Sequence, residues 1–221
     1  MSLIVTGTGT EVGKTIACAV ILTRHARRRR IAYWKPIATG SSESSDARII
    51  RGIVGKNVEI LSEVYSLGPP VSPHLAARLE RRRIEPERVV DAFVTHALAD
   101  DRRNLLIEGI GGLLVPLTDD GYLLASLFEE LHLPLLIVAS SRLGTINHTL
   151  LTLEAARSRR LEIAGVILSG PPNAENRRAI ERFGSVDVLA EVPVIRSITQ
   201  QGITRAARLF DRKGRLKQYF E

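Results

Sequence analysis

"GTGTEVGKT", residues 7–15, separates the apolar run "LIVT" (3–6) from a second apolar stretch, "IACAVIL" (16–22). A glycine-rich loop between a strand and a helix can surround a phosphate with backbone N–H groups, and the helix N-terminus adds a favourable field. Lys14 supplies a mobile positive charge for the outer phosphates, and the hydroxyl of Thr15 can coordinate Mg²⁺. The stretch therefore predicts a binding site for nucleotide phosphates.

The loop departs from the common G-x-x-x-x-G-K-[ST] pattern at its first glycine. Gly7 stands one residue further from Gly13 than that pattern requires, and Thr8 occupies the usual glycine position. A merely tight turn would explain the glycines but not the lysine–threonine pair that ends the loop. The carboxylate of Glu11 is unfavourable beside phosphates, so we expect it to face solvent, a cation, the base or the ribose.

Apolar runs alternate with amphipathic stretches along the rest of the chain. Several of the runs are apolar at almost every position, which is typical of strands buried on both faces of a parallel sheet. The expected strands are 3–6, 31–37, 104–109, 133–140, 163–169 and 186–194, and the expected helices are 14–28, 86–99, 122–131, 145–159, 174–183 and 202–212. The alternation predicts one α/β domain over residues 1–221, doubly wound, with a mainly parallel sheet and helices on both faces, as in P-loop nucleotide-binding proteins.

Composition excludes several classes of protein. The 221 residues are 44% hydrophobic and 25% charged, as in a soluble globular protein, and we expect a cytoplasmic location because neither a membrane span nor a signal peptide is visible. The lone Cys18 excludes a disulfide framework. The net charge of +7 permits an anionic partner, but no aromatic residue interrupts the runs "ARRRR" (26–30) and "ERRR" (80–83). Solvated helix ends are therefore favoured, and we expect no nucleic-acid or membrane partner.

Ligands of a doubly wound sheet bind beyond the carboxyl ends of its strands. The residues that follow the expected strands are chemically suited to such a site. The phosphate loop follows the first strand, Lys35 ends the second, Glu108 ends the third, and the polar segments 140–144 and 169–170 follow later strands. We expect all of them along one edge of the sheet.

Two acidic residues are candidates for holding a cation. Magnesium prefers oxygen ligands, usually one or two carboxylates together with phosphates and water. Glu108 ends an apolar strand beside glycines, and Asp46 closes a serine-rich loop, so Thr15, Asp46 and Glu108 are the predicted metal ligands. Asp46 could instead cap the N-terminus of a helix at 47–53. Lys35 could stabilise charge that develops during phosphoryl transfer, the alternative being simple exposure at a strand end.

With these features in place, the chain resembles the dethiobiotin synthetases, ATP-dependent carboxylases that close the ureido ring in biotin synthesis. The matching stretches occur in the family's order from residue 1 to about 195. They are "VTGTGTEVGKT" (5–15), "YWKPIATGS" (33–41), "SDA" (45–47), "VSPHLAA" (71–77), "IEGIGGLLVPL" (107–117) and "RLGTINHTLLTLEA" (142–155).

The resemblance implies a ligase that acts as a homodimer on a diaminononanoate, carbon dioxide and ATP with Mg²⁺. One amine takes up carbon dioxide as a carbamate, the γ-phosphoryl group converts the carbamate to a mixed anhydride, and the second amine closes the ring. The resemblance also implies a substrate site divided between the two subunits.

The family's motif positions assign roles to residues of this chain. Lys14, Thr15 and Lys35 would be catalytic, and Thr15, Asp46 and Glu108 would hold Mg²⁺. Thr39 would contact the substrate, and the tail carboxylate of the diamine would lie near Leu143, Gly144 and Asn147 of the partner subunit. The implied nucleotide-binding residues are Glu11, Val12, Gly13, Lys14, Thr15, Ile16, Asp46, Glu108, Gly109, Ile110, Gly111, Ser169, Gly170, Val192, Pro193 and Val194.

Two segments depart from the family pattern. Ser169-Gly170 stands where many members have Asn-Asp, and serine cannot make the paired amide hydrogen bonds with which that asparagine reads adenine. We therefore hypothesise looser base discrimination. The basic tail "RKGRLKQYFE" (212–221) has no counterpart in the family pattern.

Three other classes of protein remain as alternatives. A regulatory ATPase of the chromosome-partition or septum-placement type usually carries a lysine near the start of its loop, where this chain has Thr6, Gly7 and Thr8. A cobalamin-type amidase would need a glutaminase domain with a catalytic cysteine, for which the chain has no room. A non-catalytic nucleotide-binding module would need neither Lys35 nor Glu108.

Overall fold

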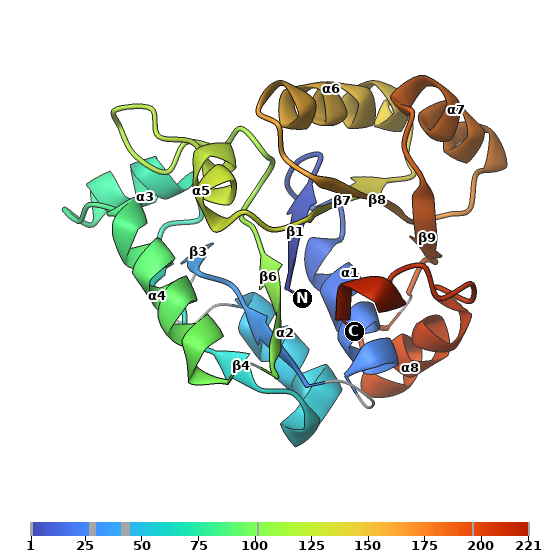
Figure 1. Ribbon diagram of the computed structural model, residues 1–221, viewed down its shortest axis with the longest axis horizontal. Helices are drawn as coiled ribbons and strands as arrows, with labels where there is room; N and C mark the ends of the chain where they lie inside the picture. Colours follow the sequence, from blue (N-terminus) through green and yellow to red (C-terminus); the bar gives the residue numbers. More distant parts are fainter. Residues whose placement is uncertain (1, 27–29, 41–44, 101, 196, 221) are drawn as a thin grey trace.

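The computed structural model describes residues 2–26, 30–40, 45–100, 102–195 and 197–220 (Figure 1). The strands within these residues are β1 (Leu3–Gly7), β2 (Ile31–Trp34), β3 (Ile37–Thr39), β4 (Ile60–Leu61), β5 (Tyr65–Leu67), β6 (Asn104–Glu108), β7 (Leu135–Ser140), β8 (Ile163–Ser169) and β9 (Val188–Val192). Seven of them form a parallel sheet in the order β4-β2-β6-β1-β7-β8-β9, and β3 pairs in parallel with β5 in a second sheet.

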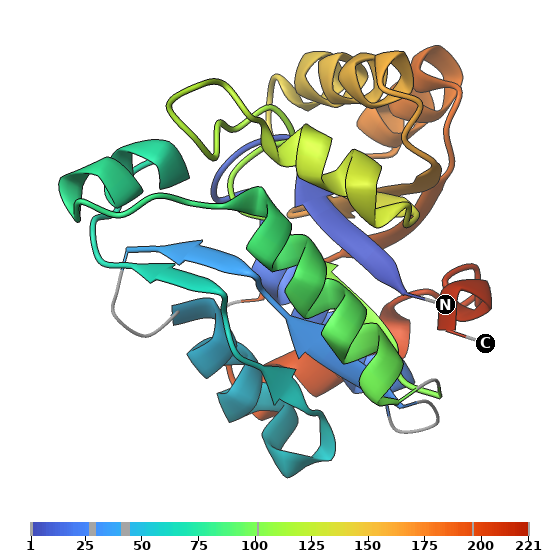
Figure 2. The ribbon, with the colours of Figure 1, turned by 60° about the vertical axis from the view of Figure 1, so that its left-hand side comes forward.

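Helices cover both faces of the main sheet. They are α1 (Lys14–His25), α2 (Ser45–Val54), α3 (Pro73–Leu79), α4 (Pro86–Ala99), α5 (Leu124–Leu131), α6 (Thr145–Ser158), α7 (Ala174–Gly184) and α8 (Gln200–Leu209), with 3₁₀ turns η1 (Gly55–Asn57) and η2 (Lys217–Phe220). Figure 2 shows α1, α2 and α8 below the sheet and the other helices above it. Within the described ranges, no helix is both long and apolar enough to cross a membrane.

Strand β1 shows why the sheet is covered on both faces. Every residue of β1 is buried. Because side chains alternate along a strand, Leu3 and Val5 pack in the apolar cluster that contains α1 and α8, whereas Ile4 packs in the cluster with α5 and α6. The central position of β1, between β6 and β7, requires apolar residues on both faces, and the sequence supplies them.

The fold class predicted from the sequence is confirmed, but two of the expected strands are wrong in extent. The single strand expected at 31–37 is interrupted after Trp34, and the chain passes into the second sheet as β3. Pro36 lies at this break, where it has no N–H to donate but its carbonyl accepts from Val64 N (2.8 Å) and Tyr65 N (3.0 Å). The strand expected at 186–194 is shorter and ends before Pro193.

The expected helices agree with the structure to within about three residues at each end. α1 ends at His25, and residues 27–29 of the arginine run lie outside the described residues. Residues 41–44 of the serine-rich loop also lie outside them. α2 begins at Ser45, so the interpretation of Asp46 as an N-cap is wrong, because this residue already lies in the first helical turn.

The C-terminal tail is packed against the sheet at the edge opposite the strands' carboxyl ends. Leu216 and Phe220 are buried, and the buried carboxylate of Asp211 accepts from Leu216 N at 3.0 Å. The amide of Asn104, at the start of β6, donates to the Phe220 carbonyl at 3.2 Å. Both ends of the chain accordingly lie close together in Figures 1 and 2. The tail is therefore part of the hydrophobic core.

Replacement of Phe220 by alanine tests this role of the tail. We expect Phe220→Ala to lower the free energy of unfolding by about 3 kcal/mol, because a fully buried aromatic ring is lost. Urea titration followed by circular dichroism measures the change. Phe183→Ala is the matched control, since the Phe183 ring is 64% exposed, and its effect should stay within about 0.5 kcal/mol. Equal effects of the two substitutions would contradict the packing described here.

Candidate active site

The register of the central strands brings separate parts of the chain to one edge. Val5 of β1 pairs with Glu108, the last residue of β6, and Trp34 of β2 pairs with Ile107 of the same strand. Lys35 directly follows β2, and the glycine-rich loop directly follows β1. The carboxyl ends of β1, β2 and β6 therefore hold the loop, Lys35 and Glu108 side by side, where ligands of doubly wound sheets bind.

The glycine-rich loop has a shape that specific glycines permit. Gly13, the N-cap of α1, has a φ of 96°, and a Cβ atom there would lie 2.5 Å from Ser169 Oγ. The ammonium group of Lys14 donates to the carbonyl of Gly9 at 2.9 Å and to that of Gly111 at 2.7 Å. Lys14 thus spans the loop and the segment after β6, with its positive charge at the N-terminus of α1.

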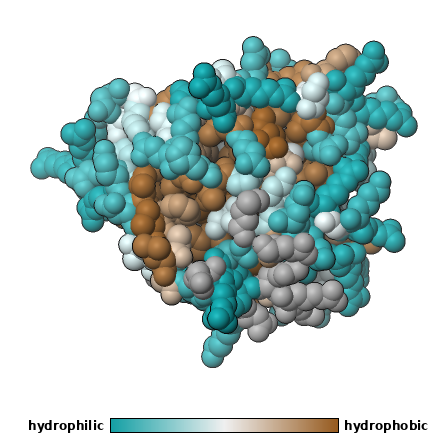
Figure 3. All heavy atoms as spheres, viewed as in Figure 1, coloured by the Kyte–Doolittle hydropathy of each residue, from teal (hydrophilic) through white to brown (hydrophobic). Residues whose placement is uncertain are grey.

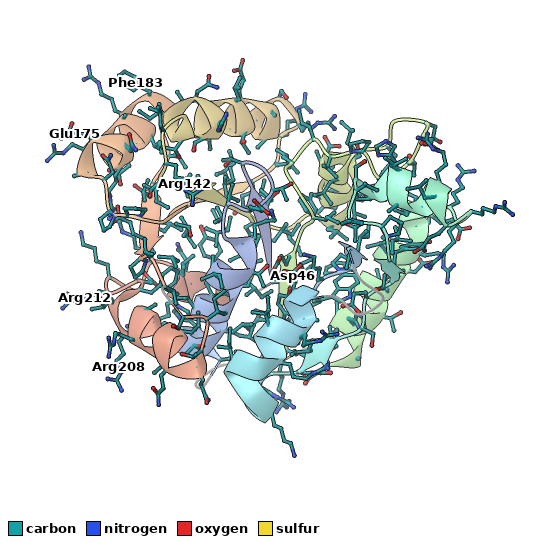
Figure 4. The ribbon with its side chains drawn as sticks, turned by 180° about the vertical axis from the view of Figure 1, so that it is seen from behind. Asp46, Arg142, Glu175, Phe183, Arg208 and Arg212 are labelled. Atoms are coloured by element: carbon teal, nitrogen blue, oxygen red, sulfur yellow. The ribbon has the colours of Figure 1, made fainter. Side chains whose placement is uncertain are left out.

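Five of the predicted site residues form a single cluster of polar groups, and four of them contact one another directly. The Thr15 hydroxyl lies 2.7 Å from Asp46 Oδ1 and 2.9 Å from Glu108 Oε1. Lys35 Nζ donates to the Asp46 carboxylate and, at 3.2 Å, to Glu108 Oε1. Lys14 completes the cluster through its charge, and Glu108 is only 1% exposed. Figure 4 shows Asp46 at the end of α2 that faces the centre of the molecule.

Burial and neighbouring charges set the protonation of this cluster. Burial lowers the pKa of Lys35, but the carboxylates of Glu108 and Asp46 outweigh it, so that this pKa lies above its ordinary value. Burial raises the pKa of Asp46, yet Lys35 and the Thr15 hydroxyl bring it below its usual range. Burial lowers the pKa of Lys14, partly offset by Glu108. At neutral pH the cluster therefore holds charged Lys35 and Asp46 in contact.

The oxygen atoms of Thr15, Asp46 and Glu108 fit Mg²⁺. One hydroxyl and two carboxylates match the few protein ligands that this ion takes beside nucleotide phosphates. In the part of the chain that the structure describes, no group of three or more His, Cys, Asp or Glu side chains could hold a metal. The hydroxyl and the two carboxylates suit a magnesium ion that also binds nucleotide phosphates.

Other predicted nucleotide-binding residues lie along the same edge. A Cβ atom on Gly109 would lie 2.8 Å from Phe128 Cζ, which explains the glycine there. Gly170 N donates to the Val192 carbonyl at 2.9 Å, so the ends of β8 and β9 are joined next to Ser169. Glu11 and Val194 are exposed, and the remaining residues of this group, Val12, Ile16, Ile110 and Pro193, are half-buried. Contact of these residues with a base, and looser base discrimination, stay predictions.

The predicted substrate residues form a separate group. Thr39 ends β3 and is half-buried. Leu143 is fully exposed, Gly144 is the N-cap of α6 with a φ of 92°, and Asn147 is exposed on the first turn of that helix. Among the described residues, none of these four hydrogen-bonds to the charged cluster around Glu108. Their role in binding the diamine stays a prediction.

Sequence reasoning missed Tyr33 as a neighbour of the site. Its hydroxyl donates to Glu108 Oε2 at 2.9 Å, and its ring is fully buried. The Cys18 thiol, one turn after Thr15 on α1, is a second such neighbour: burial, and then the nearby Glu108, raise the pKa of this thiol well above its ordinary value. One signal was available for Tyr33: it stands two residues before Lys35, and side chains two apart on a strand share a face.

A glycine-rich loop that ends in a lysine–threonine pair, with the threonine hydroxyl in contact with two carboxylates at the edge of a parallel sheet, defines a P-loop nucleotide-binding protein. A family profile described as "AAA domain" matches residues 1–202. The ATP-dependent dethiobiotin synthetase BioD of Paramagnetospirillum magneticum is 43% identical over 195 residues, covering 88% of this chain and 89% of that protein. BioD of Lawsonia intracellularis is 40% identical over 200 residues, covering 90% of this chain and 91% of that protein. The chain belongs to the ATP-dependent dethiobiotin synthetase family.

Three further comparisons concern length and fold. The chain is 42% identical to the biotin biosynthesis bifunctional protein BioCD of Bordetella avium, covering 90% of this chain but only 41% of that protein. The cell division ATPase MinD of Pyrococcus furiosus superposes with a TM-score of 0.59 at 19% identity, covering 99% of this chain and 97% of MinD. A ParA family ATPase of Chlorobium tepidum superposes with a TM-score of 0.57 at 14% identity, covering 94% of this chain and 97% of that protein. At such low identities these likenesses show the fold alone.

Two glycines of the loop provide a matched test of its geometry. Gly13→Ala should weaken ATP binding at least about tenfold, because alanine is strained at positive φ and its Cβ would displace Ser169. Gly9→Ala should change ATP affinity less than about twofold, since nothing lies within 4 Å of a Cβ at that position. Isothermal titration with ATP measures both. The loop geometry is wrong if Gly9→Ala proves as harmful as Gly13→Ala.

Proposed function

We propose that the chain catalyses the dethiobiotin synthetase reaction, in which ATP drives the closure of a ureido ring from 7,8-diaminononanoate and carbon dioxide. The contact network of Thr15, Lys35, Asp46 and Glu108, beside Lys14 of the phosphate loop, supports this proposal most strongly. A module that merely binds nucleotide needs the loop but not a second, buried lysine between two carboxylates. The likeness of about 40% to named synthetases over most of the chain supports the same activity.

The proposed reaction has three balanced steps. One amine of the diamine adds to carbon dioxide and loses a proton, giving a carbamate. A carbamate oxygen then attacks the γ-phosphorus of ATP, the bond to the β-phosphate oxygen breaks, and ADP leaves. The second amine attacks the carbamate carbon and loses a proton, the carbon–oxygen bond breaks, and phosphate leaves with the ring closed. Phosphorylation is needed because a carbamate oxygen is otherwise a poor leaving group.

The two lysines would stabilise the negative charge of phosphoryl transfer. Lys14 lies at the N-terminus of α1, where the helix dipole and the loop N–H groups also favour phosphate. Lys35 is 6% exposed and charged, so its field is weakly screened by water. A preorganised, buried cation lowers the barrier of phosphoryl transfer, because it stabilises the negative charge that develops on oxygen in the transition state. We assign Lys35 to the carbamate and the transferred phosphoryl group.

Thr15, Asp46 and Glu108 would hold Mg²⁺, which supplies charge neutralisation at the phosphates when bound. Lys35 forms ion pairs with the same two carboxylates. Asp46 and Glu108 would therefore balance the positive charge of both the Lys35 ammonium group and the bound metal. Thr39 would bind the diamine. The N-terminus of α6, with exposed Leu143 and Asn147, would bind the tail carboxylate of a diamine held in the partner subunit, which makes a homodimer part of the proposal.

The proposed reaction is tested by incubating the protein with the diamine, bicarbonate, Mg²⁺ and ATP. Mass analysis should find a product heavier than the diamine by one carbonyl unit less two hydrogens, with one phosphate released per product. Lys35→Ala should reduce turnover at least about 100-fold, as the loss of one preorganised donor does elsewhere. Lys56→Ala, on the exposed turn η1, is the control and should leave turnover unchanged. Phosphate release without product would refute the proposed function.

The shared site is tested by mixing two inactive variants. Lys35→Ala and Asn147→Ala homodimers should each be inactive, yet exchange of subunits should restore roughly a quarter of the wild-type sites, because half of the dimers are hybrids with one intact site. Mixing Lys35→Ala with Asp46→Ala is the control. Both residues belong to the same half of the site, so no activity should return. Equal results for the two mixtures would rule out a site built from two subunits.

A further inference from the structure

The two carboxylate oxygens of Glu108 have different partners. Oε1 lies 2.9 Å from the Thr15 hydroxyl and accepts from Lys35 Nζ at 3.2 Å, so it faces the phosphate loop. Oε2 accepts from the Tyr33 hydroxyl at 2.9 Å. Tyr33 is fully buried and contributes to neither the loop nor the charged cluster. The role of this hydroxyl is therefore separate from the roles assigned above.

The sheet register explains why Tyr33 reaches Glu108. Tyr33 of β2 pairs with Leu106 of the neighbouring strand β6, and Glu108 stands two residues further along β6, on the same face. A diagonal neighbour at this spacing is within reach of a long aromatic side chain. The Tyr33 ring packs in the cluster between the sheet and α1, which also holds Cys18. Packing thus fixes the ring, and the ring fixes the position of its hydroxyl.

We propose that Tyr33 is a positioning residue, which holds Glu108 Oε2 so that Oε1 is presented to the Mg²⁺ of the bound nucleotide. This inference deepens the proposed function and rests on it. The terminal torsion of a glutamate is broad, so the carboxylate alone does not select one orientation. The Tyr33 hydrogen bond selects it, and partners of this kind typically change metal affinity by 10–100-fold.

Burial makes the hydroxyl hard to replace. Glu108 is 1% exposed, so water has little access to Oε2. The Cys18 thiol also interacts with Glu108, but a thiol is a weak hydrogen-bond donor and would replace the hydroxyl poorly. Oε2 would then be buried without its Tyr33 donor, and the carboxylate would turn about its terminal torsion away from the orientation described here. Mg²⁺ would have to restore that orientation when it binds, so its affinity falls.

The experiment compares Tyr33→Phe with Tyr65→Phe. Each substitution removes one buried hydroxyl, but that of Tyr65 accepts from Glu85 N at 3.0 Å and lies in the apolar cluster on the opposite face of the sheet. Mn²⁺ serves as the probe, with its binding to the protein–ADP complex followed by electron paramagnetic resonance. We expect Tyr33→Phe to weaken Mn²⁺ binding about tenfold and Tyr65→Phe to leave it unchanged. ADP affinity in EDTA should be unchanged in both.

A second readout separates positioning from general damage. In Tyr33→Phe the Mg²⁺ concentration that gives half of the maximal rate should rise about tenfold, while kcat at saturating Mg²⁺ should return close to the wild-type value. A loss of folded protein would lower kcat at every Mg²⁺ concentration. Thermal melting of both variants accompanies the measurement.

The outcomes distinguish the inference from the function on which it rests. If wild-type protein binds Mn²⁺ with ADP and Tyr33→Phe behaves as Tyr65→Phe does, the positioning role is wrong and the proposed function stands. If wild-type protein binds no Mn²⁺ in the presence of ADP, the proposed function fails together with the inference. A Tyr33→Phe variant that does not fold also contradicts the inference, because the hydroxyl would then serve stability first.

Discussion

The buried carboxylate of Glu108 is the interaction on which the site depends. A charge that is 1% exposed costs several kcal/mol unless other groups compensate it. Here Lys35 does so from the residue after β2, Thr15 from α1, and Tyr33 from β2. Each partner is held by a different local constraint: the strand end, the first turn after the phosphate loop, and the packed face of the sheet. The fold therefore places the proposed metal ligands and the second lysine together.

Much of this arrangement could be predicted from the sequence. The alternation of apolar runs and amphipathic segments indicates a doubly wound sheet, and chemistry at the strands' carboxyl ends then selects Thr15, Lys35 and Glu108. Strand order could not be predicted, because nothing in the sequence says that β2 lies beside β6. The contact of Tyr33 with Glu108 depends on that adjacency. The second sheet was also missed, since β3 and β5 are only three residues long and give no periodic signal.

The arginine excess is largely spread over the surface. Arg78 pairs with Asp119, and Arg83 with Asp120, in exposed contacts that contribute little to stability. Figure 3 shows hydrophilic side chains projecting around the outline of one face, with apolar side chains gathered left of its centre and near its upper edge. The three arginines of the 80–83 run are exposed to solvent just after α3, away from the phosphate loop. The charge that matters for the site is that of the two buried lysines.

In the proposed reaction, the γ-phosphoryl group of ATP passes to a carbamate oxygen at this edge of the sheet, and not to water. The most direct test is a brief incubation with ¹⁸O-labelled carbon dioxide in ordinary water, followed by mass analysis of the phosphate. One labelled oxygen is expected in each phosphate, because the carbon–oxygen bond of the anhydride breaks when the ring closes. Unlabelled phosphate would show hydrolysis by water and would contradict the proposed transfer to a carbamate.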